Sequence, residues 1–196
     1  MSNFTEKEEK ERISWWKKKL GSCSTGWEVG DKKGHHAKTA DIINHSRKIA
    51  VELKREKGGS LDNQNGNLIT LSNRLESRIE DANEKFKQYP GYQTILIIEL
   101  ETDVISAQVV MSGLSQIHFK NGNRIGQSIK NKKLYCGMKQ IYRDIGAIVL
   151  WPSSGNIFHG VQFYFNNPSA KTDRKILIDE AEKIICGKLK PLNFLS

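Results

Sequence analysis

The stretch from Thr39 to Arg55 constrains the fold of this chain more than any other part of the sequence. Two short, mainly apolar runs, Ala40–Ile43 and Ile49–Leu53, flank the polar segment Asn44–Arg47. Apolar runs separated by about four polar residues are typical of a β-hairpin. We therefore predict two adjacent antiparallel strands.

Acidic residues stand in both predicted strands. Asp41 lies at the start of the first strand, and alternation along the second places Glu52 and Lys54 on one face. Two carboxylates and an ammonium group are therefore expected at one end of the strand pair. Such oxygen ligands suit a hard cation, for example Mg²⁺ in phosphate chemistry. The alternative is a solvated strand end with an ordinary cross-strand ion pair, although the apolar flanks favour burial.

This pattern resembles the signature of the PD-(D/E)XK nuclease superfamily, the restriction-endonuclease-like fold. Asp41 matches the first acid of that signature, Glu52 the second acid and Lys54 the lysine, while Ala40 stands where the family usually has Pro. The resemblance covers only these positions and a compatible order of elements. It implies an α/β fold with a mixed central β-sheet flanked by helices, built on an αβββαβ core. The length of the chain predicts that residues 1–196 form one domain.

The resemblance also implies a set of site residues. Asp41, Glu52 and the backbone carbonyl of Leu53 would bind the metal ion, and Lys54 would orient and activate the attacking water. Many members of the superfamily carry an acid on the first helix that reaches the metal site, and Glu9 matches it by position. The alternative for Glu9 is a stabilising interaction with the helix dipole, which favours acids in a first turn.

The first helix is predicted from a capping box formed by Thr5 and Glu8, and it ends at Gly21. Its apolar stripe consists of Ile13, Trp16 and Leu20. The other elements expected from periodicity and turn residues are a strand at 27–29, a helix at 72–88, a buried strand at 94–100, a hairpin at 116–125, a helix at 128–144, a strand at 147–151, a turn at 152–156, a strand at 157–165 and a helix at 172–186.

A basic loop at 31–38 leads directly into Asp41 and carries His35 and His36. Such a loop could contact phosphates, and either histidine could bind metal or move a proton. Histidines in a loop are, however, mostly solvated.

Composition limits the partners. The net charge of +9 favours a polyanion, which by charge alone could be DNA, RNA or an anionic membrane. No apolar run approaches membrane-spanning length, so a membrane partner is not expected. The three cysteines include no C-x-x-C pair, which predicts reduced thiols in a cytoplasmic protein and neither a disulfide framework nor a zinc site.

Together these features predict a Mg²⁺-dependent DNA endonuclease. Two alternatives remain: an RNA-directed nuclease of the same fold, or a non-catalytic module that binds nucleic acid or another partner through its basic surface. A homodimer is expected only by analogy with restriction-type relatives.

Overall fold

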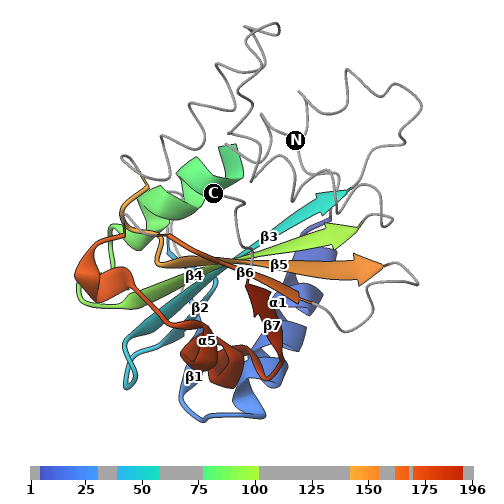
Figure 1. The fold of residues 1–196 in the computed structure, drawn as a ribbon. Coiled ribbons are helices and arrows are strands. Elements are labelled where there is room, and N and C mark those ends of the chain that lie inside the picture. The colour runs from blue at the N-terminus through green and yellow to red at the C-terminus, as the bar shows by residue number, and fades with distance from the viewer. Residues whose placement is uncertain are drawn as a thin grey trace, which may run out of the picture.

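The fold is an α/β arrangement in which helices cover both faces of a seven-stranded mixed sheet (Figure 1). The computed structural model describes residues 5–30, 39–57, 77–101, 142–154, 162–167 and 170–191. In chain order its elements are α1 (Glu6–Gly21), β1 (Trp27–Val29), β2 (Ile42–Asn44), β3 (Ile49–Lys57), a helix described over 77–86, β4 (Gln93–Glu101), β5 (Ala147–Ser154), β6 (Gln162–Asn166), η2 (Thr172–Arg174), α5 (Ile178–Ile185) and β7 (Leu189–Pro191).

The strands lie in the sheet in the same order as in the chain. β1, β2 and β3 form an antiparallel meander, and β3, β4 and β5 run parallel to one another. β6 is antiparallel to β5, and β7 is parallel to β6. The predicted hairpin is therefore confirmed, with Ile42 opposite Val51. The predicted central strand is also confirmed, because Ile95 to Ile98 of β4 are fully buried.

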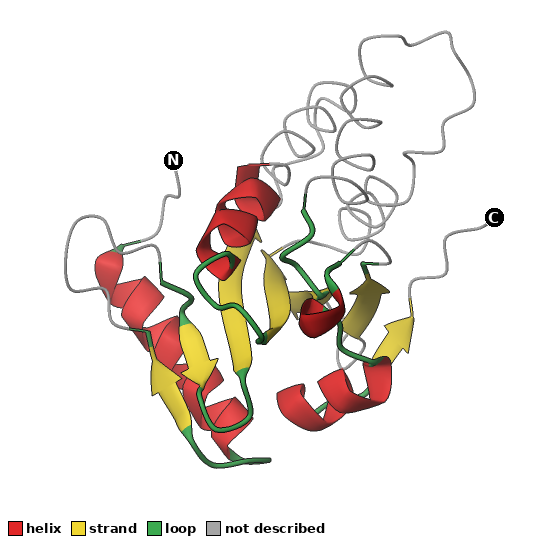
Figure 2. Cartoon of the chain, turned by 90° about the vertical axis from the view of Figure 1, so that its left-hand side faces the viewer, coloured by secondary structure: helices red, strands yellow, loops and turns green. Residues whose placement is uncertain are grey.

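The two faces of the sheet have separate cores. One contains Ala50, Leu96 and Ile148 together with Ile79, Ala82 and Phe86 of the helix over 77–86. The other contains Val51, Leu53, Ile97 and Val149 together with Ile13, Trp16 and Leu20 of α1 and Ile184 and Ile185 of α5. Figure 1 shows the helix over 77–86 on one side of the sheet and α1 and α5 on the other, and Figure 2 shows α1 alongside β1. Because side chains alternate along β3, Glu52 and Lys54 share the face of Ala50, and Leu53 faces α1.

The first helix forms as predicted. The Thr5 hydroxyl accepts a hydrogen bond from the Glu8 backbone N–H, and the Glu8 carboxylate accepts one from the Thr5 backbone N–H at 2.7 Å. The apolar stripe is buried against the sheet. The capping box and the stripe thus fix both the start and the orientation of α1.

The helix predicted at 172–186 is wrong in its first half. Residues 172–174 form the short helix η2, the chain then extends, and α5 begins only at Ile178. Arg174 explains the break, because its buried guanidinium donates to Asp144 at 3.1 Å and to the backbone carbonyls of Tyr89 and Tyr92. Leu177 is 73% exposed because it precedes the helix as its N-cap.

Three further differences concern the second half of the chain. Residues 152–154 continue β5 instead of turning, because β4 continues alongside them. Residues 142–144 form a coil and turn, not the end of a helix, and β7 was not predicted. The hairpin at 116–125, most of the helix at 128–144, the loop at 31–38 with His35 and His36, and the first residues of the strand at 157–165 lie outside the described residues.

Cys23 and Cys186 form a disulfide that links the segment after α1 to the C-cap of α5, with 6.0 Å between their Cα atoms. The prediction of reduced thiols is therefore wrong for these two residues. They are 163 positions apart, and only the packing of α1 beside α5 brings them together. Cys136 lies outside the described residues. Across the described part of the chain, no helix is both long and apolar enough to cross a membrane.

Candidate functional site

The candidate site lies where β3 continues past the end of β2. β2 pairs only with Ile49 to Val51 of β3, so within the described residues β3 has no antiparallel neighbour from Glu52 onward. The register that places Ile42 opposite Val51 brings Asp41 next to Glu52. The chain is held there by the Gly30 backbone N–H, which donates to the Asp41 carbonyl at 3.0 Å.

Asp41 is buried, with 2% of its surface exposed. Its Oδ2 accepts a hydrogen bond from the Leu53 backbone N–H at 2.9 Å. This side-chain bond takes the place of a strand-to-strand bond beyond the end of β2. It fixes the carboxylate of Asp41 against β3 at the level of Glu52 and Leu53.

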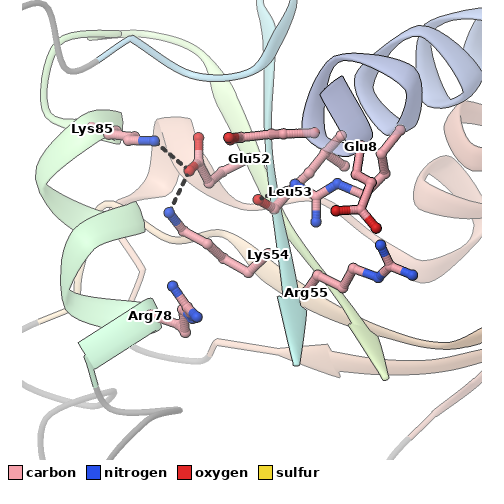
Figure 3. Close-up of a pocket in the computed structure, with 9 residues that line it drawn as sticks. Glu8, Glu52, Leu53, Lys54, Arg55, Arg78 and Lys85 are labelled. Carbon is pink, nitrogen blue, oxygen red and sulfur yellow. Dashed lines mark hydrogen bonds and ion pairs between the residues drawn. The ribbon is translucent and has the colours of Figure 1, made fainter. Parts of the chain in front are cut away.

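Glu52 is fully buried, and both ammonium groups near it bind the same oxygen atom (Figure 3). Its Oε1 lies 2.8 Å from Lys54 Nζ and 2.6 Å from Lys85 Nζ. Its Oε2 is buried and has no hydrogen-bond partner among the described residues. Burial and the charge of Asp41 raise the pKa of Glu52, and the two lysines offset only part of that rise. The ionised carboxylate would therefore gain from a further cation at Oε2.

The helix over 77–86 supplies the other wall of the site. Asp81 and Lys85 are one turn apart on this helix, with 3.8 Å between Asp81 Oδ2 and Lys85 Nζ. Lys54 Nζ forms an ion pair with Asp81 as well as with Glu52. Burial lowers the pKa of Lys85, but the charges of Glu52 and Asp41 outweigh it and raise the pKa above its ordinary value. Lys85 is thus a cation at neutral pH.

Arg12 approaches the site from α1, on the opposite face of the sheet. Its Nη2 donates to the Leu53 backbone carbonyl at 3.2 Å, and its Nη1 donates to Glu99 Oε2 at 3.3 Å. Trp16 Nε1 donates to the other oxygen of Glu99 at 2.5 Å. Glu99, on β4, therefore anchors α1 and holds Arg12 against the Leu53 carbonyl, which the resemblance to the nuclease superfamily implies as a metal ligand.

A polar pocket opens between α1 and the helix over 77–86, across β3 (Figure 3). Among the described residues it is lined by Glu8, Glu9, Arg12, Glu52, Leu53, Lys54, Arg55, Arg78 and Lys85. Five of these side chains are basic and three are acidic. The predominance of positive charge around a buried carboxylate suits a phosphate-bearing ligand.

Of the predicted site residues, Asp41, Glu52, Leu53 and Lys54 come together at the end of the hairpin. Glu9 is exposed and lies at the edge of the same pocket. In the part of the chain that the structure describes, no three acidic, histidine or cysteine side chains gather closely enough to hold a metal ion. Glu9 is therefore not placed as a third ligand, and its role in catalysis stays a prediction.

The residues of the site fit a hard divalent cation. Two buried carboxylates and one backbone carbonyl lie close together, on β3 and on the residue just before β2, and all three supply oxygen atoms. Glu52 Oε2 has no hydrogen-bond partner among the described residues, so this oxygen atom could coordinate a cation. Mg²⁺ commonly takes only one or two protein carboxylates and keeps several water ligands. Two acids and a carbonyl are enough for such a cation.

Several residues of the site were not predicted from the sequence, among them Arg12, Arg55, Arg78, Asp81, Lys85 and Glu99. Glu99 had a recognisable signal, since it is an acid inside a continuous apolar strand and a buried acid needs a partner. Asp81 and Lys85 also had a weak signal, being oppositely charged residues one turn apart on a predicted helix. Arg12 is one of many charged residues on α1, and its spacing alone does not distinguish it.

Comparisons with known proteins add no family to this description: no protein-family profile matches the sequence, and neither a curated protein nor a solved structure matches it. The class of protein is therefore defined by the structure alone. It is an α/β protein with a seven-stranded mixed sheet and helices on both faces.

Proposed function

We propose that this protein is a Mg²⁺-dependent endonuclease that hydrolyses phosphodiester bonds in DNA. The observation that carries the proposal is the convergence of Asp41, Glu52 and Lys54 at the end of the β2–β3 hairpin, with both acids buried and Glu52 Oε2 lacking a hydrogen-bond partner among the described residues. Buried carboxylates are costly unless a cation balances them. A metal ion bound here would balance the two buried carboxylates.

The order of the elements supports the likeness to the PD-(D/E)XK superfamily. The chain runs from α1 through β1, β2 and β3 to the helix over 77–86 and then to β4, which is the αβββαβ order expected for that fold. Asp41 lies immediately before β2, beside the (D/E)-x-K segment on β3, which matches the order of the signature. The remaining strands extend the sheet beyond this core.

Each residue has a defined task in the proposed reaction. Asp41, Glu52 and the Leu53 carbonyl would hold Mg²⁺, which when bound supplies positive charge that activates water and offsets charge on the phosphate. Lys54, held between Glu52 and Asp81, would donate a hydrogen bond to the attacking water and so orient it. Arg55 and Arg78 on the pocket wall would attract the phosphate backbone.

A non-catalytic nucleic-acid-binding protein is the second candidate. The observation that favours it is that Lys54 and Lys85 already neutralise Glu52 without a metal ion. Such a protein would use the basic pocket to bind phosphates and would hold its acids only for structural reasons. It would bind nucleic acid equally well with and without Mg²⁺ and would cleave nothing.

The test is an incubation of supercoiled plasmid DNA with the full chain in Mg²⁺ or in EDTA, with a structured RNA treated in parallel. The proposed function predicts nicked or linear plasmid only in Mg²⁺, and intact RNA. Cleavage of the RNA alone would transfer the proposal to the RNA-directed nuclease of the same fold. Intact substrates under all conditions, with binding to DNA retained, would establish the second candidate. A cytoplasmic location also stays a prediction, since the Cys23–Cys186 disulfide removes one of the reasons for it.

A further inference from the structure

Two ammonium groups share one oxygen atom of the fully buried Glu52, which is an unusual arrangement for a carboxylate that is to bind a metal ion. Lys54 is the lysine of the predicted signature, whereas no motif in the sequence assigns Lys85. The two nitrogens contact Glu52 Oε1 at 2.8 and 2.6 Å. The role of Lys85 therefore has to be inferred from its contacts in the structure.

We propose that Lys85 is a phosphate-binding residue that exchanges the Glu52 carboxylate for a phosphodiester group of the nucleic acid when a divalent cation enters the site. The inference rests on the proposed function, and it adds the residue and the order of events. Without the cation, Glu52 Oε1 pairs with Lys85; a cation bound at Oε2 would balance the charge of the carboxylate, so that Lys85 is released.

Charge balance supports the exchange. Without a metal ion, the negative charges of Asp41, Glu52 and Asp81 face the two ammonium groups of Lys54 and Lys85, and the cluster carries one net negative charge. A divalent cation bound by Asp41 and Glu52 adds two positive charges, so the net charge of the cluster becomes positive. Like charges in a partly buried site repel, and an anion from outside then becomes the favoured partner.

Lys85, rather than Lys54, is the group free to exchange. Lys54 has a second direct ion pair with Asp81 and is fixed on the central part of β3. Lys85 approaches Asp81 only at 3.8 Å, so after the release of Glu52 this longer ion pair is the acidic contact that remains to it among the described residues. Its side chain lines the same pocket as Arg55 and Arg78, where a phosphate would be bound.

The exchange predicts opposite effects of one substitution. In Lys85→Gln, a competitor for Glu52 is lost, so the cation should bind more tightly. The same variant lacks the phosphate contact, so nucleic acid should bind less tightly once the cation is present. Without the cation, Lys85 is occupied by Glu52, and its loss should change nucleic-acid binding little. A purely structural lysine would not produce this combination.

The experiment uses the full chain as unmodified protein, Lys85→Gln, Lys85→Arg and the matched control Lys87→Gln. Lys87 directly follows the helix over 77–86, is exposed and pairs with Glu84. Ca²⁺ affinity is measured by isothermal titration calorimetry, and binding of a short DNA duplex is measured by fluorescence anisotropy in Ca²⁺ and in EDTA. Thermal unfolding checks each variant, and Lys85→Met, which keeps the aliphatic stem, replaces Lys85→Gln if the latter does not fold.

For Lys85→Gln we expect Ca²⁺ affinity to rise about 5-fold and DNA affinity in Ca²⁺ to fall about 10-fold, the usual size of coupling between two bound ligands. DNA affinity in EDTA should stay close to that of the unmodified protein. Lys85→Arg and Lys87→Gln should resemble the unmodified protein in all three measurements. Unchanged or weaker Ca²⁺ binding by Lys85→Gln, or an equal loss of DNA affinity with and without Ca²⁺, would overturn the proposal. Neither readout requires cleavage, so an inactive protein that shows the exchange would refute the nuclease function and leave the role of Lys85 intact.

Discussion

Replacing Glu99 with Gln tests how α1 is held against the site. Glu99 on β4 accepts hydrogen bonds from Arg12 and Trp16, and the Arg12 and Glu99 side chains are only 12% and 9% exposed. Solvent therefore screens this ion pair little. Glu99→Gln preserves the volume and one acceptor oxygen, but it removes the charge that balances the Arg12 guanidinium.

The expected cost follows from this burial. Breaking a buried ion pair outright costs about 3–5 kcal/mol. Gln can still accept a hydrogen bond from Trp16, and Arg12 keeps its hydrogen bond to the Leu53 carbonyl. We therefore expect the free energy of unfolding to fall by about 2–3 kcal/mol, the contribution of one hydrogen bond to a charged group. For a chain of this size, that loss corresponds to a Tm lower by roughly 4–12 °C.

Urea unfolding followed by circular dichroism measures the change, and Glu84→Gln is the control. Glu84 pairs with Lys87 on the surface, where both side chains are about half exposed, so its loss should cost less than about 1 kcal/mol. A double-mutant cycle with Arg12→Met then isolates the Arg12–Glu99 interaction. Equal stability of Glu99→Gln and Glu84→Gln, or additive effects in the cycle, would refute the argument that this ion pair anchors α1.

Three further predictions concern the site. Glu9→Gln should weaken cleavage and metal affinity by about 10–100-fold, the scale of a supporting residue, while Glu6→Gln on the same helix should change neither in a metal titration. Gly30→Ala should lower the free energy of unfolding by about 1–3 kcal/mol in urea titrations, because its Cβ would lie 1.9 Å from the Ala40 carbonyl oxygen. Glu52→Gln should gain stability relative to the unmodified protein as the pH rises above 4.5, as measured by unfolding at a series of pH values.

The sign of the pH effect follows from the raised pKa of Glu52. Since the folded state binds the proton more tightly than the unfolded state, the stability that Glu52 contributes is present below its ordinary pKa of 4.5 and is lost as the pH rises through its folded pKa. Gln does not titrate and so lacks this loss. A stability difference between the two proteins that is constant from pH 4 to pH 7 would contradict the burial argument.

The other two variants have contradicting outcomes of their own. Equal metal titrations for Glu9→Gln and Glu6→Gln would leave Glu9 as a helix-dipole partner. A free energy of unfolding that is unchanged in Gly30→Ala would show that the Gly30 contact is relaxed at little cost.

The hairpin could be predicted because its information is local. Alternation in Ile49–Leu53 and the polar turn before it determine which side chains share a face, and the structure confirms both strands and their antiparallel pairing. The same local reasoning placed Glu52 and Lys54 on one face of β3. It also predicted α1, because a capping box and an apolar stripe are local signals.

The partners of those side chains could not be predicted in the same way. Lys85 and Asp81 reach the site only because the helix over 77–86 packs on that face of the sheet, and periodicity does not specify which turn of a helix meets which strand residue. The break between η2 and α5 depends on Arg174 binding Asp144 and two distant carbonyls. The Cys23–Cys186 disulfide likewise depends on two helices lying side by side.

The central claim is that Asp41 and Glu52 hold the cation on which cleavage depends. Its most direct test is the Mg²⁺ dependence of DNA cleavage by the unmodified protein and by Asp41→Ala, measured together with DNA binding and thermal unfolding. The account predicts Mg²⁺-dependent cleavage by the unmodified protein and none by Asp41→Ala at any Mg²⁺ concentration, with folding retained and DNA bound as by the unmodified protein in EDTA, because the basic pocket is intact. Cleavage by a folded Asp41→Ala protein at the rate of the unmodified protein, or cleavage by the unmodified protein in EDTA, would contradict it.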